Sequence, residues 1–344
     1  MNLRIGILGA TGLVGRATLA ILEQRGFPCD APRLLASDRA AGRTLAFRGQ
    51  SVAVEPTTAS SFDGLAIVLL AVQNPLALAW APVARAAGAV VVDLSSAHRD
   101  LDDVPLVVPE INGDRVRPGV TLIANPNCST AAFVLALAPL ARAARLTRVA
   151  VTTLQSVSGA GAAALDELER GVRMGLDGTP PARAGGLPPF AWNVVPAIGS
   201  FEPNGYTREE MKMVRETRKI LDLPELPVTA TATRVPVRVG HCVAVNARFD
   251  RPLGPDEARA SWRAFPGLML VDDPAADRYP TALAAAGGDP VLVGRARADL
   301  TDPHGLEFFV ASDNLRKGAA LNAVQIAERV AALMAASQPV VARP

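Results

Sequence analysis

The residues near the N-terminus constrain the fold of this chain more than any other stretch. The apolar run LRIGILGA at residues 3–10 predicts a strand, and a helix is expected over residues 12–26. Between them, GATGLVG places Gly9, Gly12 and Gly15 where the backbone must turn. Glycine lets the chain approach a pyrophosphate, whose charge is stabilised by N–H groups at the helix N-terminus. A strand, this glycine loop and a helix in that order predict a dinucleotide-binding turn.

Short apolar strands continue to alternate with helices through the first third of the chain. Strands are expected at residues 33–37, 66–72, 89–95 and 121–125, and a further helix at residues 76–88. Parallel strands need crossover connections, and helices usually provide them. This alternation therefore predicts an α/β fold with a Rossmann-type domain, in which helices cover both faces of a mostly parallel sheet.

The pattern changes at about Val149, where β-like runs become longer, as in RVAVTTLQSVSG and VTATATRVPVRVG. These runs predict a second, α+β domain on an open mixed sheet that is mostly antiparallel. Residues 177–189 are expected to be a Pro- and Gly-rich loop. The final helix is expected to pack back on the first domain. We therefore predict a dinucleotide-binding domain of residues 1–127 plus helix 314–337, and a second domain of residues 128–313.

Composition narrows the possible functions. The 344 residues allow two domains, and a formal net charge of +2 argues against nucleic acid as a partner. Neither a signal peptide nor an apolar run long enough to cross a membrane is expected. Three cysteines are too few for a disulfide framework and suit the reducing cytoplasm. The three histidines have no metal-ligand spacing with them, so no metal is expected.

Cys128 is the cysteine with a chemically suggestive setting. It lies in IANPNCSTAAF, between a predicted Asn-Pro-Asn turn and a long apolar helix. A thiol reacts as the thiolate, and a helix N-terminus is one place where the backbone lowers its pKa. A buried structural cysteine is the alternative, but the flanking polar residues disfavour it. We therefore predict that Cys128 is a nucleophile, and that Cys29 and Cys242 are structural.

A thiolate that attacks a carbonyl needs a proton donor and acceptor and a means of holding anions. Arg234 and His241 are candidates, seven residues apart in TRVPVRVGHC. On one unbroken strand this odd spacing would place them on opposite faces, so a bend or bulge at Pro236 or Gly240 is expected. Glu209 and Lys212 share a helix face, where a solvated salt bridge is the alternative interpretation. Arg99 follows the fourth predicted strand.

The choice of dinucleotide is open from the residues alone. Asp38, after the second strand, could hold the ribose hydroxyls and favour NAD. Ser37 and Arg39 could instead hold a 2′-phosphate and favour NADP.

Several longer motifs carry a resemblance to a known family. GATGLVG, NPNCST, LQSVSGAG, FAWNVVPAIGSF, EEMKMVRETRKIL, RVPVRVGH and DNLRKGAALNAVQIAE occur here in this order. In this the chain resembles bacterial aspartate-β-semialdehyde dehydrogenases from about residue 3 to residue 330. The resemblance implies NADP-dependent reduction of L-aspartyl 4-phosphate to aspartate semialdehyde with release of phosphate. It also implies a homodimer and a place in lysine, threonine and methionine biosynthesis.

The resemblance also implies roles for individual residues. Cys128 would form a thioester, His241 would be the general acid and base, and Gln155 would position the intermediate. Arg234 would clamp the substrate α-carboxylate and Glu209 would bind its ammonium group. Phosphate would be held by Arg99 and Lys212, and Asn127 would support the cysteine turn. The implied NADP contacts are Gly9, Thr11, Gly12, Leu13, Val14, Gly15, Ser37, Arg39, Ser158, Gly159, Gly161 and Asn314.

Two stretches depart from the family pattern. The loop after the third strand usually reads Ser-Ala-Gly-Gly-Ser but here is AVQNPLALAW, which introduces Gln73, Asn74 and Pro75. The usual Asp-Asn-Ser-Ser-Ala-Phe-Arg becomes DLSSAHR, with Leu94 for an amide and His98 for an aromatic ring. Both changes fall near the expected nicotinamide and phosphate positions. A paralogue with altered or lost activity is therefore one alternative, and an acetylglutamyl-phosphate-reductase-like enzyme is another.

Overall fold

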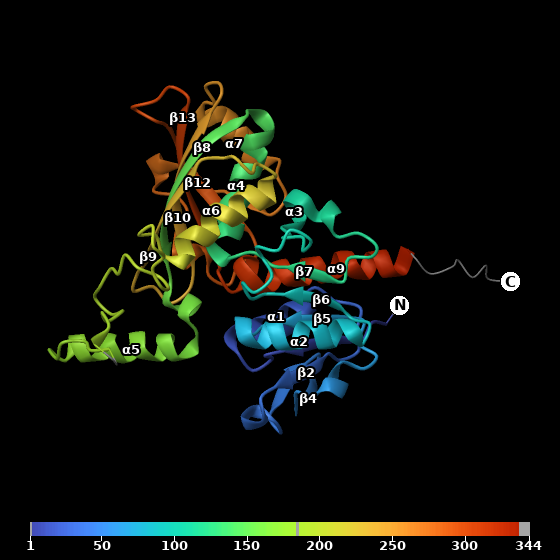
Figure 1. Cartoon of the computed structure of the whole chain (residues 1–344). Coiled ribbons are helices and arrows are strands. Elements are labelled where there is room, and N and C mark those ends of the chain that lie inside the picture. Colours follow the sequence, from blue (N-terminus) through green and yellow to red (C-terminus); the bar gives the residue numbers. More distant parts are fainter. Residues whose placement is uncertain (1, 184–185, 337–344) are drawn as a thin grey trace. The chain divides into compact units, whose positions relative to one another are not determined.

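The chain folds into two compact units in a computed structural model that describes residues 2–183 and 186–336 (Figure 1). The first unit is Met1–Pro126 together with Ala319–Pro344, and the second is Asn127–Gly318. Each unit is built around its own sheet. The α/β fold expected from the sequence is confirmed, with a Rossmann-like parallel sheet first and a mixed sheet second.

The first unit holds a seven-stranded sheet in the order β3-β4-β2-β1-β5-β6-β7. Its strands are β1 (Ile5–Leu8), β2 (Arg33–Ala36), β3 (Thr44–Phe47), β4 (Gln50–Pro56), β5 (Ile67–Leu70), β6 (Val90–Asp93) and β7 (Leu122–Ala124). All neighbours pair in parallel except β3 and β4, which form an antiparallel hairpin. The five predicted strands are present, each shorter than its apolar run. The hairpin was not anticipated from the sequence.

Helices cover both faces of this sheet. They are α1 (Leu13–Gln24), α2 (Asn74–Ala86), α3 (Pro109–Asn112) and α9 (Leu321–Ala336), with 3₁₀ turns at Asp38–Ala40, Ala59–Phe62 and Gly113–Arg115. Strand side chains alternate between faces, and Ile5, Ile7 and Leu69 share one buried cluster with α1 and α9. Helix α2 packs on β5 and β6 but contributes nothing to that cluster. It therefore covers the opposite face.

The C-terminal helix of the described chain belongs to the core of the first unit. A π-helical turn at Arg316–Ala320 precedes α9, which packs against α1 and β6. The predicted end at residue 337 lies outside the described residues. Arg316–Ala336 is 21 residues long and, by length and composition, apolar enough to cross a membrane, contrary to the expectation from the sequence. Half of its most apolar window is buried within the protein, as in the core helix of a globular domain.

The second unit holds a six-stranded sheet in the order β11-β12-β13-β10-β8-β9. Its strands are β8 (Leu146–Gln155), β9 (Val228–Arg234), β10 (His241–Phe249), β11 (Leu268–Leu270), β12 (Val291–Ala298) and β13 (Gly305–Ser312). The β8–β9 and β11–β12 pairs are parallel, and the other three pairs are antiparallel. The sheet is thus mixed, with antiparallel pairs in the majority, as the sequence predicted.

Helices α4 (Cys128–Ala143), α6 (Arg208–Leu221) and α7 (Pro255–Arg263) cover one face of this second sheet. The short helix α8 (Ala282–Ala285) packs on the other face, where Ala285 shares a buried cluster with Cys242, Leu292 and Ala311. Helix α5 (Ala162–Leu176) packs against the 3₁₀ turn at Val157–Ala160, and another 3₁₀ turn lies at Pro274–Ala276. Helix α4 packs on β8, β10, β12 and β13, whereas α6 packs on β9. Along β8, Val149, Val151 and Thr153 are buried on this face, while Thr152 and Leu154 on the other are more exposed. This alternation is typical of a sheet with its main helical layer on one side.

The predicted loop at residues 177–189 contains no strand or α-helix in its described part, and residues 184 and 185 lie outside that part.

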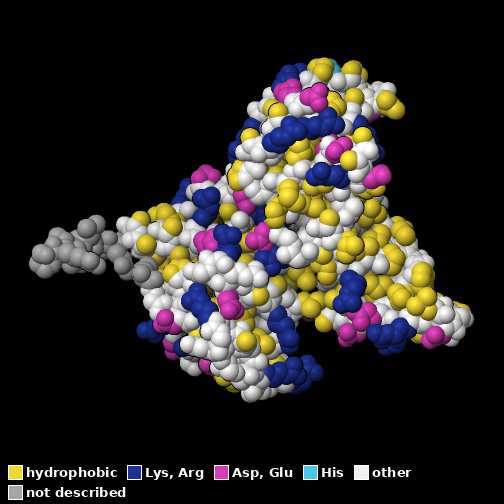
Figure 2. Space-filling view, turned by 180° about the vertical axis from the view of Figure 1, so that it is seen from behind, with side chains coloured by type: hydrophobic (Ala, Val, Ile, Leu, Met, Phe, Trp, Pro, Cys, Tyr) yellow, Lys and Arg dark blue, Asp and Glu magenta, His cyan; other side chains and the backbone are white. Residues whose placement is uncertain are grey.

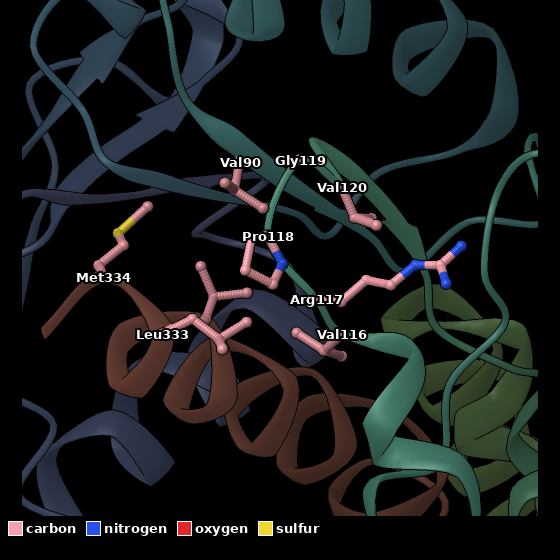
Figure 3. Close-up of a pocket in the computed structure, with 9 residues that line it drawn as sticks. Val90, Val116, Arg117, Pro118, Gly119, Val120, Leu333 and Met334 are labelled. Atoms are coloured by element: carbon pink, nitrogen blue, oxygen red, sulfur yellow. The ribbon is translucent and has the colours of Figure 1, made fainter. Parts of the chain in front are cut away.

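A hollow of about 400 Å³ opens in the first unit between the loop at residues 116–120 and the end of α9 (Figure 3). Val90, Val116, Leu333 and Met334 contribute apolar side chains to it, whereas Arg117 points away from them. Val90 begins β6, so this hollow lies at the amino ends of the strands. The glycine loop follows the carboxyl end of β1.

Candidate active site

Cys128 is the first residue of α4, and a capping interaction fixes the start of this helix. The side-chain oxygen of Asn127 accepts hydrogen bonds from the backbone N–H groups of Ser129 (2.9 Å) and Thr130 (3.2 Å). Asparagine is among the strongest N-cap residues because it satisfies N–H groups that the helix leaves unpaired. The thiol therefore lies half-buried at the positive end of the helix dipole, where a thiolate is favoured.

The other two cysteines have different surroundings. Cys29 and Cys242 are buried, and burial raises the pKa of each thiol, that of Cys242 to about 11. Both therefore favour the unreactive thiol form.

Gln155, Arg234 and His241 lie side by side across three strands. Gln155 ends β8, and it pairs with Arg234 at the end of β9 and with His241 at the start of β10. Residues directly opposite each other in adjacent strands point to the same face of a sheet. All three side chains are buried, on the face that α4 and α6 cover.

The predicted bend or bulge within one strand is wrong. Arg234 and His241 belong to different strands with β8 between them, joined by the loop at residues 235–240. Gly240 has a φ of +102° in this loop, and a Cβ there would lie 2.7 Å from the carbonyl oxygen of Ala282. Glycine is thus required where the chain enters β10.

Ser156 and Asn314 hold the His241 ring. The backbone N–H of Ser156 donates to His241 Nδ1 (3.1 Å), so the neutral ring carries its proton on Nε2. The Ser156 hydroxyl lies 2.9 Å from the same Nδ1 and 2.9 Å from Asn314 Oδ1. Asn314 Oδ1 also accepts from the N–H of Gly240 (3.0 Å) and from the hydroxyl of Ser158 (3.1 Å). The network fixes both the orientation and the tautomer of the imidazole.

The Nε2 atom of His241 is buried and has no hydrogen-bond partner in the described protein. Burial, and then the Arg234 charge, lower the pKa of His241 from 6.5 to about 3. The ring is therefore neutral near pH 7 and presents an N–H donor. A Cβ on Gly159 would lie 3.1 Å from Arg234 Nη1 and 3.2 Å from His241 Nε2, so this glycine leaves room beside both groups.

Arg234 is held from one side by the main chain. Its Nη1 donates to the carbonyl oxygen of Ser156 (2.6 Å), and the side chain is buried. Burial lowers the pKa of Arg234, and the negative charges of Cys128 and Glu209 oppose that change. The guanidinium thus shares an electrostatic environment with both the thiol and the carboxylate.

Glu209, on α6, connects the cysteine turn to the sheet. Its Oε1 accepts from Asn127 Nδ2 (2.7 Å) and Gln155 Nε2 (3.3 Å), and its Oε2 accepts from Lys212 Nζ (3.1 Å). Burial raises the pKa of Glu209, but the Lys212 charge and these hydrogen bonds together lower it by more. The net shift of the pKa is therefore downward. The pair with Lys212 forms at the expected i, i+3 spacing, but Glu209 is buried and not solvated.

A hollow of about 460 Å³ lies at the carboxyl ends of the strands in the first unit. Gly9, Thr11 and Gly12 line it, and Gly12 is the N-cap of α1. A Cβ on Gly9 would lie 2.3 Å from the Ala71 carbonyl oxygen, and one on Gly15 would lie 2.2 Å from the Gly9 carbonyl oxygen. Glycine is therefore obligatory at both positions. Backbone close to a helix N-terminus at this edge fits the pyrophosphate of a dinucleotide.

The other residues of the glycine loop and of the second strand end are also located. Leu13 begins α1, and Val14 packs against the core. Ser37 and Asp38 line the same hollow, and Arg39 is exposed beside them. Gly161, in the second unit, is the N-cap of α5 with a φ of +96°.

The loop between β6 and α3 contains Arg99 and two of the family departures. Arg99 is buried, and its Nη2 donates to the carbonyl oxygen of Leu94 (3.1 Å). His98 Nδ1 lies 2.6 Å from Asp93 Oδ2. Asn74 exchanges hydrogen bonds with Ser96, accepting at Oδ1 from its N–H (3.0 Å) and donating from Nδ2 to its hydroxyl (2.9 Å). The departures thus fasten this loop within the first unit.

Pro75 lies in the first turn of α2, where a helix leaves backbone N–H groups unpaired in any case. Gln73 is the N-cap of this helix and lines the hollow of the glycine loop.

Three residues near Cys128 and His241 were not identified from the sequence. Ser156 follows Gln155 directly and holds His241. Glu216, on α6, accepts the Asn127 N–H at 2.6 Å, and its i, i+7 spacing from Glu209 was the available signal. Gly318 packs against Cys128, since a Cβ at position 318 would lie 2.8 Å from Cys128 Cβ. In the described residues, no group of three or more His, Cys, Asp or Glu is arranged to hold a metal ion.

Comparison with known proteins finds a matching family model for each of the two units. Residues 4–118 match the family model for the semialdehyde dehydrogenase NAD binding domain, and residues 137–317 match the one for the semialdehyde dehydrogenase dimerisation domain. The chain belongs to the aspartate-semialdehyde dehydrogenase family. It is 44% identical over 327 residues to the enzyme from Synechocystis sp., covering 95% of this chain and 96% of that protein. It is 45% identical over 332 residues to the one from Legionella pneumophila, covering 95% of both chains.

Solved structures give the same result. Aspartate semialdehyde dehydrogenase II from Vibrio cholerae, also solved complexed with ASA, matches with a TM-score of 0.92 and 41% identity over 96% of this chain and 99% of that one. The Candida albicans enzyme, solved with NADP, matches with a TM-score of 0.75 and 25% identity over 97% of this chain and 99% of that one. The resemblance inferred from the motifs is thus confirmed at the level of the family.

Proposed function

We propose that this protein is an NADP-dependent aspartate-semialdehyde dehydrogenase that reduces L-aspartyl 4-phosphate through a thioester on Cys128. The observation that carries the proposal is the arrangement around the start of α4, where the thiol shares its surroundings with Arg234, Gln155 and Glu209. A nucleotide-binding or structural protein has no need of this set. The family and the Vibrio cholerae structure with ASA support the same substrate.

In this proposal Cys128 and His241 carry out the acyl transfer. The thiolate attacks the acyl carbon, the bond to the phosphate oxygen breaks, phosphate leaves and a thioester remains. Negative charge develops on the carbonyl oxygen, and the Nε2–H of His241 donates to it. Gln155, between His241 and Arg234 in the sheet, positions the acyl group. When the tetrahedral oxyanion later collapses to the aldehyde, its C–S bond breaks, the Cys128 thiolate leaves, and the Nε2–H of His241 donates a hydrogen bond to the same oxygen throughout.

The amino-acid end of the substrate is held by complementary charges. Arg234 forms two parallel hydrogen bonds to the α-carboxylate through its planar guanidinium. Glu209 binds the α-ammonium group, and its lowered pKa keeps it ionised for that contact. Asn127 supports both this carboxylate and the cysteine turn. Lys212 and Arg99 bind the phosphate.

The hollow lined by Gly9 and Gly12 in the first unit suits NADP. Glycine leaves the backbone there free of side chains beside the N-terminus of α1. When bound, the dinucleotide supplies the hydride that reduces the thioester to the aldehyde level. Thr11, Leu13 and Val14 form the turn around its pyrophosphate, and Ser37 and Arg39 hold the 2′-phosphate. Ser158, Gly159, Gly161 and Asn314 line the nicotinamide site. The Candida albicans structure with NADP supports this choice over NAD.

We further propose a cytoplasmic homodimer that works in lysine, threonine and methionine biosynthesis. The first unit binds the cofactor, and the second carries catalysis and dimerisation, which the matched dimerisation-domain model supports. The less covered face of the second sheet and apolar side chains exposed on the same unit are suitable contacts.

The test is phosphate-dependent reduction of NADP with aspartate semialdehyde, followed at 340 nm. We expect turnover by the native protein and at least a thousandfold less by the Cys128→Ala variant, with NADP binding nearly unchanged, because only the covalent step is lost (roughly the effect of removing a nucleophile). Cys242→Ala is the matched control and should remain active.

The same assay separates the alternatives. Turnover with N-acetylglutamate semialdehyde in preference to aspartate semialdehyde would favour the acetylglutamyl-phosphate reductase alternative. No turnover with either aldehyde would favour an inactive paralogue. Appreciable activity of Cys128→Ala would disprove the thioester mechanism.

A further inference from the structure

Asn127, the residue before the nucleophile, is held by two carboxylates from one helix. Its side-chain Nδ2 donates to Glu209 Oε1 at 2.7 Å, and its backbone N–H donates to Glu216 Oε2 at 2.6 Å. Glu209 and Glu216 are seven residues apart on α6, which places them two turns apart on one face. The nucleophile's neighbour is therefore fixed at two atoms by one rigid element.

This attachment determines where the Cys128 sulfur lies. Asn127 Oδ1 caps α4, and Cys128 is the first residue of that helix. If the Asn127 peptide rotates, the cap and the direction of the Cys128 side chain change together. A displacement of about 1 Å at a reacting atom can cost on the order of a hundredfold in rate. The bond between Glu216 and the Asn127 N–H is placed to prevent that rotation.

The burial of Glu216 indicates that its position is specified by the fold. Only 1% of its surface is exposed, and α6 packs directly against α4. Burying a carboxylate is costly unless charge-assisted hydrogen bonds and nearby positive potential offset the lost hydration. The N-terminus of α4 supplies such potential at Asn127.

We propose that Glu216 is a positioning residue for Cys128, acting through the Asn127 peptide and touching no substrate. The inference rests on the proposed function of Cys128. It assigns the two α6 carboxylates different tasks: Glu209 binds substrate and supports the Asn127 side chain, whereas Glu216 holds the main chain of the cysteine turn. We expect the position of Cys128 to depend on whether the side chain at 216 is long enough to place an acceptor oxygen at the Asn127 N–H, more than on the charge of that side chain.

Two substitutions separate reach from charge. Glu216→Gln keeps an oxygen at the same distance but removes the charge, whereas Glu216→Asp keeps the charge but shortens the side chain by one methylene. We expect kcat to fall about tenfold or more in Glu216→Asp and to stay within about threefold of native in Glu216→Gln, with KM for aspartate semialdehyde within about threefold in both.

Glu210 provides the matched control. It is a buried carboxylate on the same helix that also accepts main-chain N–H groups, those of Thr207 (2.6 Å) and Ala232 (2.9 Å), but it does not contact Asn127. Glu210→Asp should lower the urea midpoint of unfolding while kcat per folded molecule stays near native. The folded fraction of every variant is measured by circular dichroism before kinetics.

The proposal is overturned if Glu216→Gln loses more kcat than Glu216→Asp, or if Glu210→Asp loses as much kcat as Glu216→Asp. Should Cys128→Ala be inactive while both Glu216 variants keep native kcat, this inference alone fails. Should Cys128→Ala turn over, the proposed mechanism fails as well, so the two failures are distinguishable.

Discussion

The tautomer and the protonation state of His241 are set by different neighbours. Ser156 fixes the tautomer through a backbone N–H, which can only donate, so the proton of the neutral ring must lie on Nε2. Burial and the nearby Arg234 charge disfavour the imidazolium. The residue is therefore a neutral hydrogen-bond donor at rest, which suits stabilisation of charge on a substrate oxygen.

This state makes a prediction about acid stability. The pKa of His241 falls from 6.5 to about 3 on folding, so between these values the unfolded chain binds a proton that the folded protein does not. Stability from this group is complete above pH 6.5 and is lost as the pH falls, by up to about 1.4 kcal/mol per pH unit. His241→Gln should therefore lose less stability between pH 7 and pH 5 than the native protein in urea unfolding.

His304→Gln is the control for that measurement, because His304 lies away from the site, with Nδ1 3.3 Å from the Phe249 carbonyl oxygen. Equal pH dependence of the native protein and His241→Gln would contradict the assignment of a neutral, buried ring.

The loop from Asp93 to Arg99 is held by hydrogen bonds from residues that depart from the family pattern. Asp93 is fully buried and accepts from the N–H and the hydroxyl of Ser95, and it also contacts His98. Asn74 holds Ser96 from the neighbouring loop. Both family departures thus add hydrogen bonds to the segment that ends at Arg99. These hydrogen bonds favour the interpretation that the changed residues still hold Arg99 in place, over the alternative that they impair the site.

His98→Phe tests that interpretation, since phenylalanine resembles the aromatic ring usual at this position in the family but cannot bond to Asp93. We expect KM for phosphate to rise about three- to tenfold, the effect of losing about one hydrogen bond, because Arg99 is then held less firmly. His304→Phe, in the second unit, should leave KM for phosphate unchanged. An unaltered KM in His98→Phe would show that the Asp93–His98 contact does not position Arg99.

The second unit exposes large apolar side chains between Leu176 and Phe201, and we define Leu176, Leu187, Trp192, Val194 and Phe201 as its apolar patch. Each of these side chains is more than half exposed, and Figure 2 shows apolar side chains gathered toward α5 on this face. Monomers seldom expose extended apolar patches, so this one suits a second copy of the chain.

Light scattering after size-exclusion chromatography should give twice the monomer mass of 35.8 kDa. The double variant Trp192→Glu/Phe201→Glu should shift toward monomer, because two charges would be buried without partners. Leu300→Glu is the control, since Leu300 is fully exposed outside the patch. A native protein that elutes as a monomer would exclude the proposed dimer.

The sequence by itself determined the fold class, the family and the setting of Cys128. Glycines at positions 9 and 15, alternating strands and helices, and an Asn-Pro-Asn turn before an apolar helix are local patterns. Each depends on backbone sterics or periodicity within about a dozen residues, so one segment suffices to recognise it. The structure confirms the fold, and the comparisons confirm the family. The roles of the individual site residues stay predictions.

Only the tertiary structure decided how distant segments meet. The sequence suggested one bent strand for Arg234 and His241, whereas Gln155 separates them in the sheet. It also gave no reason to connect Glu216 with Asn127, or Ser156 with His241. Strand order and register follow from how whole faces pack. The Asn127–Glu216 and Ser156–His241 contacts join residues 89 and 85 positions apart, and such contacts leave no mark on local periodicity. Local sequence patterns identify candidate site residues, but tertiary packing brings these residues together.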